Sequence, residues 1–399
     1  MVYAKTLFIM RICLVSHSFY PAMCYGGPIF STYELCKKLA KLGFKVYVST
    51  TNANCSKSLK VKVNKFVKLE DNFFVKYYKE QITYYLSLSL ILNLWKDIKN
   101  SDVVYIQYIF HYTVPIALLF SWIFKKQTII CPRASLSPWG LKWKGFLSKS
   151  FKKLWLNFFI SPFSNFVTWQ GCSTIEINDI LSQFSNVKYF ELSDGIDTNS
   201  FKNTKKISYN NLLKKYANKN FKNISNVIFS MGRLHKIKGY DNLIKSFSFL
   251  LKQNPNCKLI IAGSGDNYKN QLMNLIKSLK LENSVFLIGQ LNELEKKEVL
   301  TSCSLFALCS HVESFGIVVL ESLASGTPVV VSDKTIWRNI GKQKCGVFVS
   351  NEADVFGAGL LNALSKDFSP SDCIAFSKKY DINEIVNLFL KHINNERKF

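Results

Sequence analysis

The stretch His311–Asp333 reads HVESFGIVVLESLASGTPVVVSD, and the interpretation of the whole chain starts from it. A polar entry is followed by an apolar run with helical spacing, then by Gly326 and Pro328, and finally by VVVS. This order predicts a loop, a helix over Val318–Ser325, a stop at the glycine and a buried strand over Val329–Ser332. The stretch is therefore typical of one helix-to-strand step in an α/β fold.

Two carboxylates belong to this stretch, Glu313 just before the predicted helix and Glu321 within it. Phe315 and Gly316 stand where the helix should begin, and a helix N-terminus favours a phosphate because its N–H groups and dipole are positive. Carboxylates beside an anion site make sense if the ligand also carries hydroxyl groups. A sugar nucleotide carries both.

Length and composition describe a globular protein of two domains. The chain has 399 residues, of which 48% are hydrophobic and 20% charged, which excludes a disordered protein. Its net charge is +25, and residues 1–192 hold 24 Lys and Arg against 9 Asp and Glu. Nucleic acid, an anionic membrane face or a phosphorylated substrate would each suit such an excess.

The eleven cysteines contain no C-x-x-C pair, which argues against a disulfide framework or a zinc site and favours a reducing compartment. Arg11 interrupts the apolar opening of the chain, so a secretory signal is not expected. Met10 and Arg11 followed by ICLVS look like a natural strand start, and residues 1–9 then read as an upstream extension.

The first half of the chain alternates strand and helix patterns. A helix is expected over Ile29–Leu42, and strands are expected at Arg11–Ser16, Lys45–Ser49, Phe73–Tyr78, Val103–Gln107, Thr128–Cys131, Phe166–Thr168 and Val187–Leu192. Repeated β-α-β order predicts a doubly wound parallel sheet. The polar Lys/Asn-rich segment after SDGIDTNSF marks a domain boundary.

The second half repeats this order. Strands are expected at Val227–Met231, Lys258–Ala262, Val285–Ile288, Ser304–Leu308 and Val329–Ser332, with helices at Tyr240–Lys252, Tyr268–Leu279 and Glu293–Ser302 between them. The predicted domains are an N-terminal Rossmann-like domain over 1–195, a second over 196–375, and a helical tail over 376–399 that packs back on the first. Ligands of two such domains are expected in a cleft at the carboxyl ends of their strands.

Two segments of the first half raise the question of a membrane. Residues 103–124 carry no formal charge over a spanning length, but Gln107, His111, Pro115 and the β-branched start fit a buried strand, a loop and a buried helix at least as well. Residues 139–159 interleave lysines with aromatic residues. Such a helix lies in an anionic membrane interface or is an ordinary helix with solvated lysines, and both interpretations stay open.

Three glycine-containing motifs follow successive predicted strands of the second half. They are GRLHKIKG at Gly232–Gly239, GSG at Gly263–Gly265, and GQL at Gly289–Leu291. Arg233 and Lys238 can converge on a diphosphate, one as a planar fork and the other as a point charge. In the first half, Gly26 and Gly27 occupy the loop between the first strand and helix, where backbone can approach a ligand closely.

Together GRLHKIKG, IAGSGDNY, FLIGQL and HVESFGIVVLESLASGTPVVVSD resemble the retaining glycosyltransferases of family 4, which have the GT-B fold. The resemblance is strong over most of 226–340 and weaker in the first half, where CPRASLSPWGLKWKG is similar to a segment of bacterial members that build surface polysaccharide. It implies an α/β fold of two Rossmann-like domains facing across a cleft.

The resemblance also implies a role for each motif residue. Glu313, Arg233 and Lys238 would be catalytic, with Glu313 on the donor sugar and the two cations on the departing diphosphate. The donor would further be bound by Glu321 at the ribose, by the backbone of Phe315, Gly316 and Ile317, by Gly263, Gln290 and Leu291, and by Gly26 and Gly27. No protein nucleophile is required, and the anomeric configuration would be retained.

The chain contains no Asp-x-Asp triplet, so no metal and no cofactor is expected, with Arg and Lys acting in place of a divalent ion. It departs from the family where members often have His-x-His, since Tyr105-Ile106-Gln107 stands there. His111 and Arg133 are the remaining candidates for acceptor or sugar contacts.

These observations predict a glycosyltransferase that moves a sugar from a nucleotide-diphosphate donor to a lipid-linked oligosaccharide in bacterial surface polysaccharide synthesis. It would act in the cytoplasm, peripherally on the inner face of the plasma membrane, through 139–159. The alternatives are another GT-B sugar-nucleotide enzyme such as an epimerase, or a basic nucleic-acid-binding protein. The second lacks a recognition motif, so nucleic acid is not an expected partner.

Overall fold

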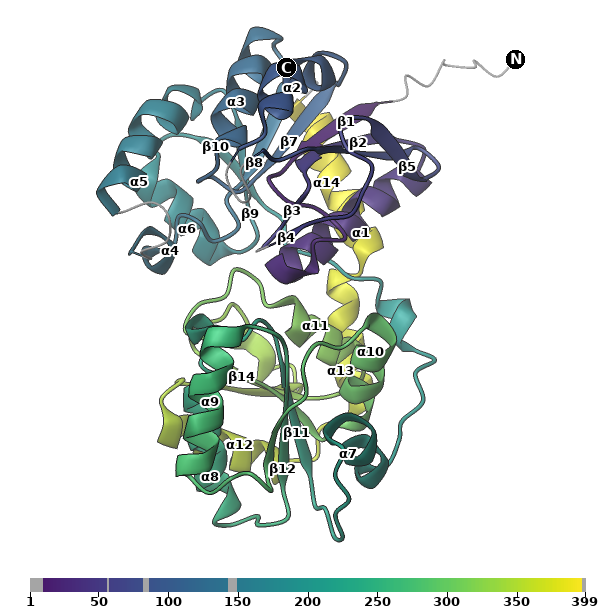
Figure 1. The fold of residues 1–399 in the computed structure, drawn as a ribbon, viewed down its shortest axis with the longest axis vertical. Helices are drawn as coiled ribbons and strands as arrows, with labels where there is room; N and C mark the ends of the chain where they lie inside the picture. Colours follow the sequence, from purple (N-terminus) through teal and green to yellow (C-terminus); the bar gives the residue numbers. More distant parts are fainter. Residues whose placement is uncertain (1–9, 56, 82–85, 143–148, 397–399) are drawn as a thin grey trace. The chain divides into compact units, whose positions relative to one another are not determined.

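The computed structural model describes residues 10–55, 57–81, 86–142 and 149–396, and the chain divides into two compact units. Unit 1 comprises Met1–Gly195 together with Ile382–Phe399, and unit 2 comprises Ile196–Asp381. The last helix, α14 (Ile382–Glu396), belongs to unit 1, where it packs beside α1 (Gly27–Lys41) (Figure 1).

Unit 1 is built on an eight-stranded sheet in the order β10-β9-β8-β7-β1-β2-β6-β5. Neighbouring strands are parallel except β5, which is antiparallel to β6 at one edge. The strands are β1 (Arg11–Val15), β2 (Lys45–Thr51), β5 (Phe66–Glu70), β6 (Phe73–Tyr78), β7 (Val103–Gln107), β8 (Gln127–Cys131), β9 (Thr168–Gly171) and β10 (Lys188–Glu191). A two-stranded hairpin, β3 (Ala53–Asn54) with β4 (Lys57–Ser58), lies outside the sheet.

Alternate side chains of the unit 1 strands enter two separate cores. Ile12 and Leu14 of β1 pack in a core with residues of α1 and α14, whereas Cys13 and Val15 pack in the other core with residues of three different helices. Those helices are α2 (Leu88–Lys99), α3 (Thr113–Ile123) and α6 (Thr174–Gln183). Helices therefore cover both faces of the sheet, as its buried apolar strands require.

Unit 2 has a six-stranded parallel sheet in the order β13-β12-β11-β14-β15-β16. The strands are β11 (Val227–Met231), β12 (Lys258–Ala262), β13 (Val285–Leu287), β14 (Leu305–Leu308), β15 (Val329–Ser332) and β16 (Gly346–Val349). The helices are α7 (Tyr209–Ala217), α8 (Tyr240–Leu251), α9 (Asp266–Ser278), α10 (Glu293–Ser302), α11 (Ile317–Ala324), α12 (Ala353–Leu364) and α13 (Pro370–Ser377). Residues of α8, α9 and α12 fill the core on one face, and residues of α7, α10, α11 and α13 fill the other.

The predicted α/β class of both halves is confirmed, with differences at several elements. The strand expected at Phe166–Thr168 begins only at Thr168, because the N–H groups of Phe166 and Val167 are bonded to the carbonyl of Phe163 in a turn. Residues 103–124 form β7, a loop and α3, and among the described residues no helix is long and apolar enough to cross a membrane.

One disulfide was not predicted from the cysteine spacing. Cys24 and Cys55 are bonded, which links the turn before α1 to the β3–β4 hairpin. The Tyr25 hydroxyl accepts the N–H of Cys55 in the same contact. The fold thus brings together two cysteines 31 residues apart that share no motif.

Candidate functional site

The loops that follow β11, β12 and β13 are joined by backbone hydrogen bonds. Gly232 N–H donates to Ala262 O at 3.0 Å, and Gly263 N–H donates to Gly289 O at 2.7 Å. Gly263 has φ +154°, and a Cβ there would lie 1.9 Å from Gly232 O. The three glycine motifs therefore form one continuous backbone surface at the carboxyl edge of the unit 2 sheet.

The turn that carries Lys238 is held against the HVES segment. His311 N–H donates to Ile237 O at 2.8 Å. Gly239 has φ +62°, and a Cβ on it would lie 2.1 Å from Cys309 O, so only glycine fits. This close approach places Lys238 directly beside Glu313.

Glu313 and Lys238 form an ion pair. Glu313 Oε1 also accepts from Ser310 Oγ at 2.8 Å, a contact that sequence analysis did not predict. Among the described residues, Glu313 Oε2 has no hydrogen-bond partner. The carboxylate is thus fixed through one oxygen while the other is free to accept a hydrogen bond from a ligand.

Glu321 is held in the same way by a different lysine. It is buried on α11, and its Oε1 lies 2.6 Å from Nζ of Lys296 on α10. Burial raises the pKa of Glu321, while the Lys296 ammonium opposes that rise. Lys296 also donates to Glu293 at 2.8 Å, and within the described chain Glu321 Oε2 has no bonded partner. Lys296 was not predicted.

The N-terminus of α11 lies between the two carboxylates in sequence. Gly316, with φ +82°, precedes the first helical residue Ile317, so the first N–H groups of α11 have no intrahelical partner. Phe315 is fully buried against Trp337, and its carbonyl accepts the Trp337 indole N–H at 2.8 Å. Phe315 can therefore offer a ligand only its N–H.

The remaining predicted donor residues of unit 2 lie on exposed loops. Arg233 and Gln290 are exposed, and Leu291 is half-buried. In the described part of the chain Arg233 forms no ion pair, and it acts with burial and Lys238 to lower the pKa of His235. Arg233 thus leaves its guanidinium available, in contrast to the paired Lys238.

In unit 1, Gly26 and Gly27 mark the start of α1. Gly26 has φ +84° and is the residue before the helix, and Gly27 is its first residue, followed by Pro28. Glycine at that φ avoids the penalty that a side chain would bring. The helix therefore begins two residues before the predicted Ile29, so that only Gly26 lies in the loop, and its donor contact stays a prediction.

His111 belongs to an aromatic group at the carboxyl ends of β1 and β7. Its ring lies 5.1 Å from that of His17, which also contacts Tyr108 and Tyr25 edge-on. His111 Nδ1 lies 3.0 Å from Thr113 Oγ1. Burial is the main cause that lowers the pKa of both histidines, to about 4 for His17. Two neutral imidazoles therefore lie together at this edge, and His17 was not predicted.

Arg133 was predicted to contact a substrate, and the structure places it in a closed network. It is buried and pairs with Asp194, while Nε donates to Gln107 Oε1 at 2.7 Å. Its remaining bonds reach Thr32 Oγ1 and Cys172 Sγ, both at 3.2 Å. These contacts link segments that follow β7, β8, β9 and β10 with α1.

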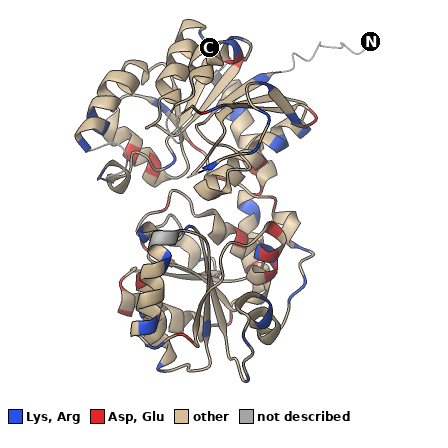
Figure 2. Cartoon of the chain, viewed as in Figure 1, with Lys and Arg blue, Asp and Glu red and all other residues tan. Residues whose placement is uncertain are grey.

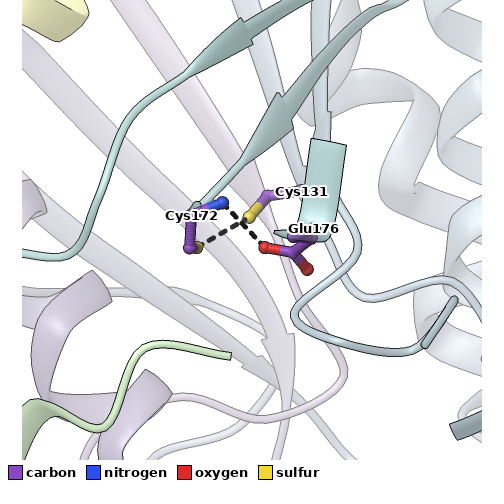
Figure 3. A group of neighbouring side chains, drawn as sticks. All are labelled: Cys131, Cys172 and Glu176. Atoms are coloured by element: carbon purple, nitrogen blue, oxygen red, sulfur yellow. Dashed lines mark hydrogen bonds between the residues drawn. The ribbon is translucent and has the colours of Figure 1, made fainter. Parts of the chain in front are cut away.

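Cys131, Cys172 and Glu176 form a buried group beside Arg133 (Figure 3). The two sulfurs are 3.8 Å apart, and their hydrogen bond together with burial raises the pKa of Cys172. Both oxygens of Glu176 already accept backbone N–H groups, from Ala134 at 2.5 Å and Cys172 at 2.7 Å. A cation here would displace these bonds next to a buried guanidinium, so the group fits a backbone clamp better than a metal site.

The predicted helix 139–159 is only partly described. The structure gives α4 (Pro138–Lys142), α5 (Lys149–Trp155) and a π-helical turn, η2 (Leu156–Ile160), and residues 143–148 lie outside the described residues. Lys152 is buried, and its Nζ donates to Gly140 O at 2.7 Å. Lys142, Lys149 and Lys153 are exposed.

A cavity of about 430 Å³ lies at the opposite edge of the unit 2 sheet. Its lining includes Asn226, Leu305 and Pro328, which stand at the amino-terminal ends of β11, β14 and β15. Ligands of open parallel sheets bind at the carboxyl ends. This cavity is therefore not the candidate donor site.

The fold, and the sequence of much of unit 2, match known proteins. The chain superimposes on the crystal structure of Anabaena HepE in complex with UDP and glucose with a TM-score of 0.70, at 17% identity, over 97% of this chain and 100% of that one. The fold is the GT-B fold of glycosyltransferases, as predicted. Residues 214–380, which make up most of unit 2, match the family glycosyl transferases group 1.

Two curated relatives are similar to part of the chain. A Campylobacter jejuni N-acetylgalactosaminyltransferase acting on N-acetylgalactosamine-N,N'-diacetylbacillosaminyl-diphospho-undecaprenol is 38% identical over 144 residues, covering 35% of this chain and 38% of that protein. The O-antigen biosynthesis glycosyltransferase WclY of Escherichia coli is 32% identical over 155 residues, covering 39% and 40%. The chain thus aligns with less than half of the length of these relatives.

Proposed function

We propose that this protein is a retaining glycosyltransferase of family 4 that transfers a sugar from a nucleotide-diphosphate donor to a lipid-linked oligosaccharide. The observation that carries the proposal is the pair of lysine-held carboxylates on either side of the α11 N-terminus. Each carboxylate keeps one oxygen for a sugar or ribose hydroxyl. The helix end and Arg233 supply positive charge for phosphates.

The reaction breaks the bond between the anomeric carbon and the donor phosphate, and negative charge develops on the leaving diphosphate. Arg233, Lys238 and the N–H groups at Gly316 and Ile317 would stabilise that charge, which is the term that most lowers such barriers. Glu313 would orient the sugar and Glu321 the ribose. Gln290 and Leu291 would lie near the base, with Gly26, Gly27 and Gly263 allowing backbone to approach the donor.

Retention would follow if the acceptor hydroxyl attacks from the side that the phosphate leaves. The departing phosphate oxygen then takes the acceptor proton, so neither a protein nucleophile nor a metal ion is needed. Two relatives support the proposed acceptor, since one is named for transfer to an undecaprenyl diphosphate glycan and the other for O-antigen biosynthesis. A lipid-linked acceptor places the enzyme at the cytoplasmic face of the plasma membrane, with residues 139–159 toward an anionic surface.

The first test is a screen of nucleotide sugars by thermal shift, followed by transfer to a membrane lipid extract with and without EDTA. We expect one nucleotide sugar to raise the melting temperature, and NMR of the product to show the donor's anomeric configuration. Inversion at the anomeric carbon would refute retention. Loss of transfer in EDTA, restored by magnesium, would refute the metal-independent site.

A further inference from the structure

Two neighbouring segments of unit 1 expose large apolar side chains in a helical pattern. On α3 these are Leu119, Trp122 and Ile123, which are 42%, 56% and 49% exposed. On α5 and η2 they include Leu154, Phe158 and Phe159, which are 52%, 70% and 45% exposed. On α3, spacings of three and four residues place the set on one side of the helix. Along α5 and η2, Leu154 and Phe158 are four residues apart and Phe159 is next to Phe158. We call these six side chains the apolar face.

The two segments lie together. Trp122 contacts Phe163, just after η2, with ring centroids 6.4 Å apart. Trp155 of α5 packs on Phe159 of η2 at 4.9 Å and donates its indole N–H to Ile109 O at 3.0 Å. The apolar face is therefore one region built on packed helices.

The core does not need these side chains. The inward sides of the same helices are already filled by Val114, Ala117 and Leu118 of α3 and by Leu156 and Ile160 of η2, all buried in one core. Leaving these six large apolar side chains in water costs free energy, about 25 cal/mol for each Å² of exposed apolar surface. Such a patch marks an interaction site.

The charge around the apolar face indicates what it contacts. No Asp or Glu occurs from residue 103 to residue 175, a stretch that holds seven lysines and Arg133. Arg133 and Lys152 are buried and bonded inside unit 1, whereas Lys125, Lys142, Lys149 and Lys153 are exposed. The ribbon of α5 accordingly carries blue, and neither α3 nor α5 carries red (Figure 2).

This combination fits a bilayer better than other partners. Nucleic acid would bind the lysines but offers nothing to six large apolar side chains, and a second copy of the face would bring like charges together. An anionic bilayer supplies phosphates for the lysines and an acyl boundary for Trp, Phe and Leu.

We infer that α3 and α5–η2 together form a surface that docks on a lipid bilayer with anionic headgroups. Trp122, Ile123, Leu154 and Phe158 enter the boundary between headgroups and acyl chains, and Lys125, Lys149 and Lys153 contact lipid phosphates. The inference extends the surface from 139–159 to α3 and removes Lys152 from it. The docking itself does not depend on the proposed function. Only its role, which is to bring the enzyme to a lipid-linked acceptor, rests on that function.

The test is co-sedimentation of the full chain with vesicles of equal parts phosphatidylglycerol and phosphatidylcholine, and with pure phosphatidylcholine. We expect binding to the anionic vesicles that falls as salt is raised. K149Q/K153Q should lower the partition coefficient about fivefold for each lysine. W122S/F158S should lower it at least tenfold, because two large apolar groups no longer enter the interface.

Matched controls lie in unit 2, where K252Q/K277Q removes two exposed lysines and M273S removes a side chain that is 51% exposed. These should bind vesicles as the wild type does. Equal binding by the unit 1 variants and the wild type would overturn the inference. So would a concentration-dependent dimer in analytical ultracentrifugation that W122S/F158S abolishes, since the face would then join two copies.

Donor binding separates this inference from the proposed function. The unit 1 variants should keep the wild-type melting temperature and the wild-type thermal shift with the nucleotide sugar found in the screen. If no nucleotide sugar binds the wild type while vesicle binding behaves as expected, the proposed function fails and the docking surface stands.

Discussion

Both units carry charged side chains at the carboxyl ends of their strands, but the two sets of charges are used differently. In unit 2, Lys238 and Lys296 each hold one oxygen of a glutamate, and among the described residues the second oxygen has no partner. In unit 1, four hydrogen bonds to protein atoms surround the guanidinium of Arg133. A charge at a strand end can therefore serve a ligand or tie loops together, and its unpaired atoms distinguish the two cases.

The largest effect on stability is expected in unit 1, where the hydrogen-bond network of Arg133 is complete. Arg133→Met leaves Asp194 buried without a partner and removes three further hydrogen bonds. Removing one partner of a buried ion pair costs about 3–5 kcal/mol, so we expect the free energy of unfolding in urea to fall by that amount. Donor binding measured under folding conditions should not change. If the variant is as stable as the wild type but loses donor affinity, Arg133 binds the donor and does not serve to hold unit 1 together.

Lys238→Met tests the open site in unit 2. If Lys238 stabilises the leaving diphosphate, kcat should fall about 10²–10³-fold while the melting temperature stays within a few degrees. Lys236→Met is the matched control, because Lys236 is an exposed lysine in the same turn. If the Lys238→Met enzyme keeps more than a tenth of wild-type kcat, Lys238 does not stabilise the leaving diphosphate.

Lys296→Met tests stability and ligand binding together. Its partner Glu321 is buried, and one carboxylate oxygen of Glu321 has no partner among the described residues. We expect a loss of about 3 kcal/mol in unfolding free energy at pH 7.5 and weaker nucleotide binding. Without Lys296, burial should raise the pKa of Glu321 further above its unfolded value. The loss then grows as pH rises and shrinks as pH falls toward the unfolded pKa, where both states are protonated. Urea titrations at several pH values measure this, and a loss independent of pH would contradict it.

The contrast also separates what the sequence could predict from what it could not. Strands β11, β12 and β15 have the bounds predicted, because runs of Val, Ile and Phe end at glycines or polar turns. The ion pair of Lys296 could not be predicted from the sequence, because Lys296 stands next to Lys297 in a Lys/Glu-rich helix. Only packing of α10 on α11 decides that Lys296 is the buried one.

Arg133 shows the opposite limit. It was a candidate for acceptor or sugar contacts because it follows a strand at a place where members of the resembled family have a histidine. Its partners Thr32, Gln107, Cys172 and Asp194 come from four segments far apart in sequence. No local pattern contains them. Lys238 and Glu313, by contrast, each belong to a motif that the sequence shows, and the structure brings the two motifs together.

The smallest effect concerns His17 and His111 of unit 1, which, unlike Lys238 and Lys296 of unit 2, form no ion pair within the described part of the chain. Among the described residues, His17 Nδ1 is buried without a hydrogen bond, and burial lowers the pKa of His17 to about 4. A histidine with a lowered folded pKa adds stability above its unfolded pKa near 6.5, and that stability is lost as pH falls toward 4. We therefore expect His17 to contribute to a fall of the melting temperature as pH drops from 6.5 toward 4.

His17→Phe keeps a ring against Tyr25 and Tyr108 but cannot take up a proton. Its melting temperature should therefore fall less steeply than the wild type's between pH 6.5 and 4, while above pH 7 the two curves should run parallel. His17→Phe/His111→Phe should flatten the slope further, because burial and His17 also lower the pKa of His111. Identical slopes in all three proteins would mean that protonation of this aromatic group does not oppose folding. The unit 1 edge would then be a site where a charged imidazole is tolerated, and its contrast with unit 2 would rest on Arg133 alone.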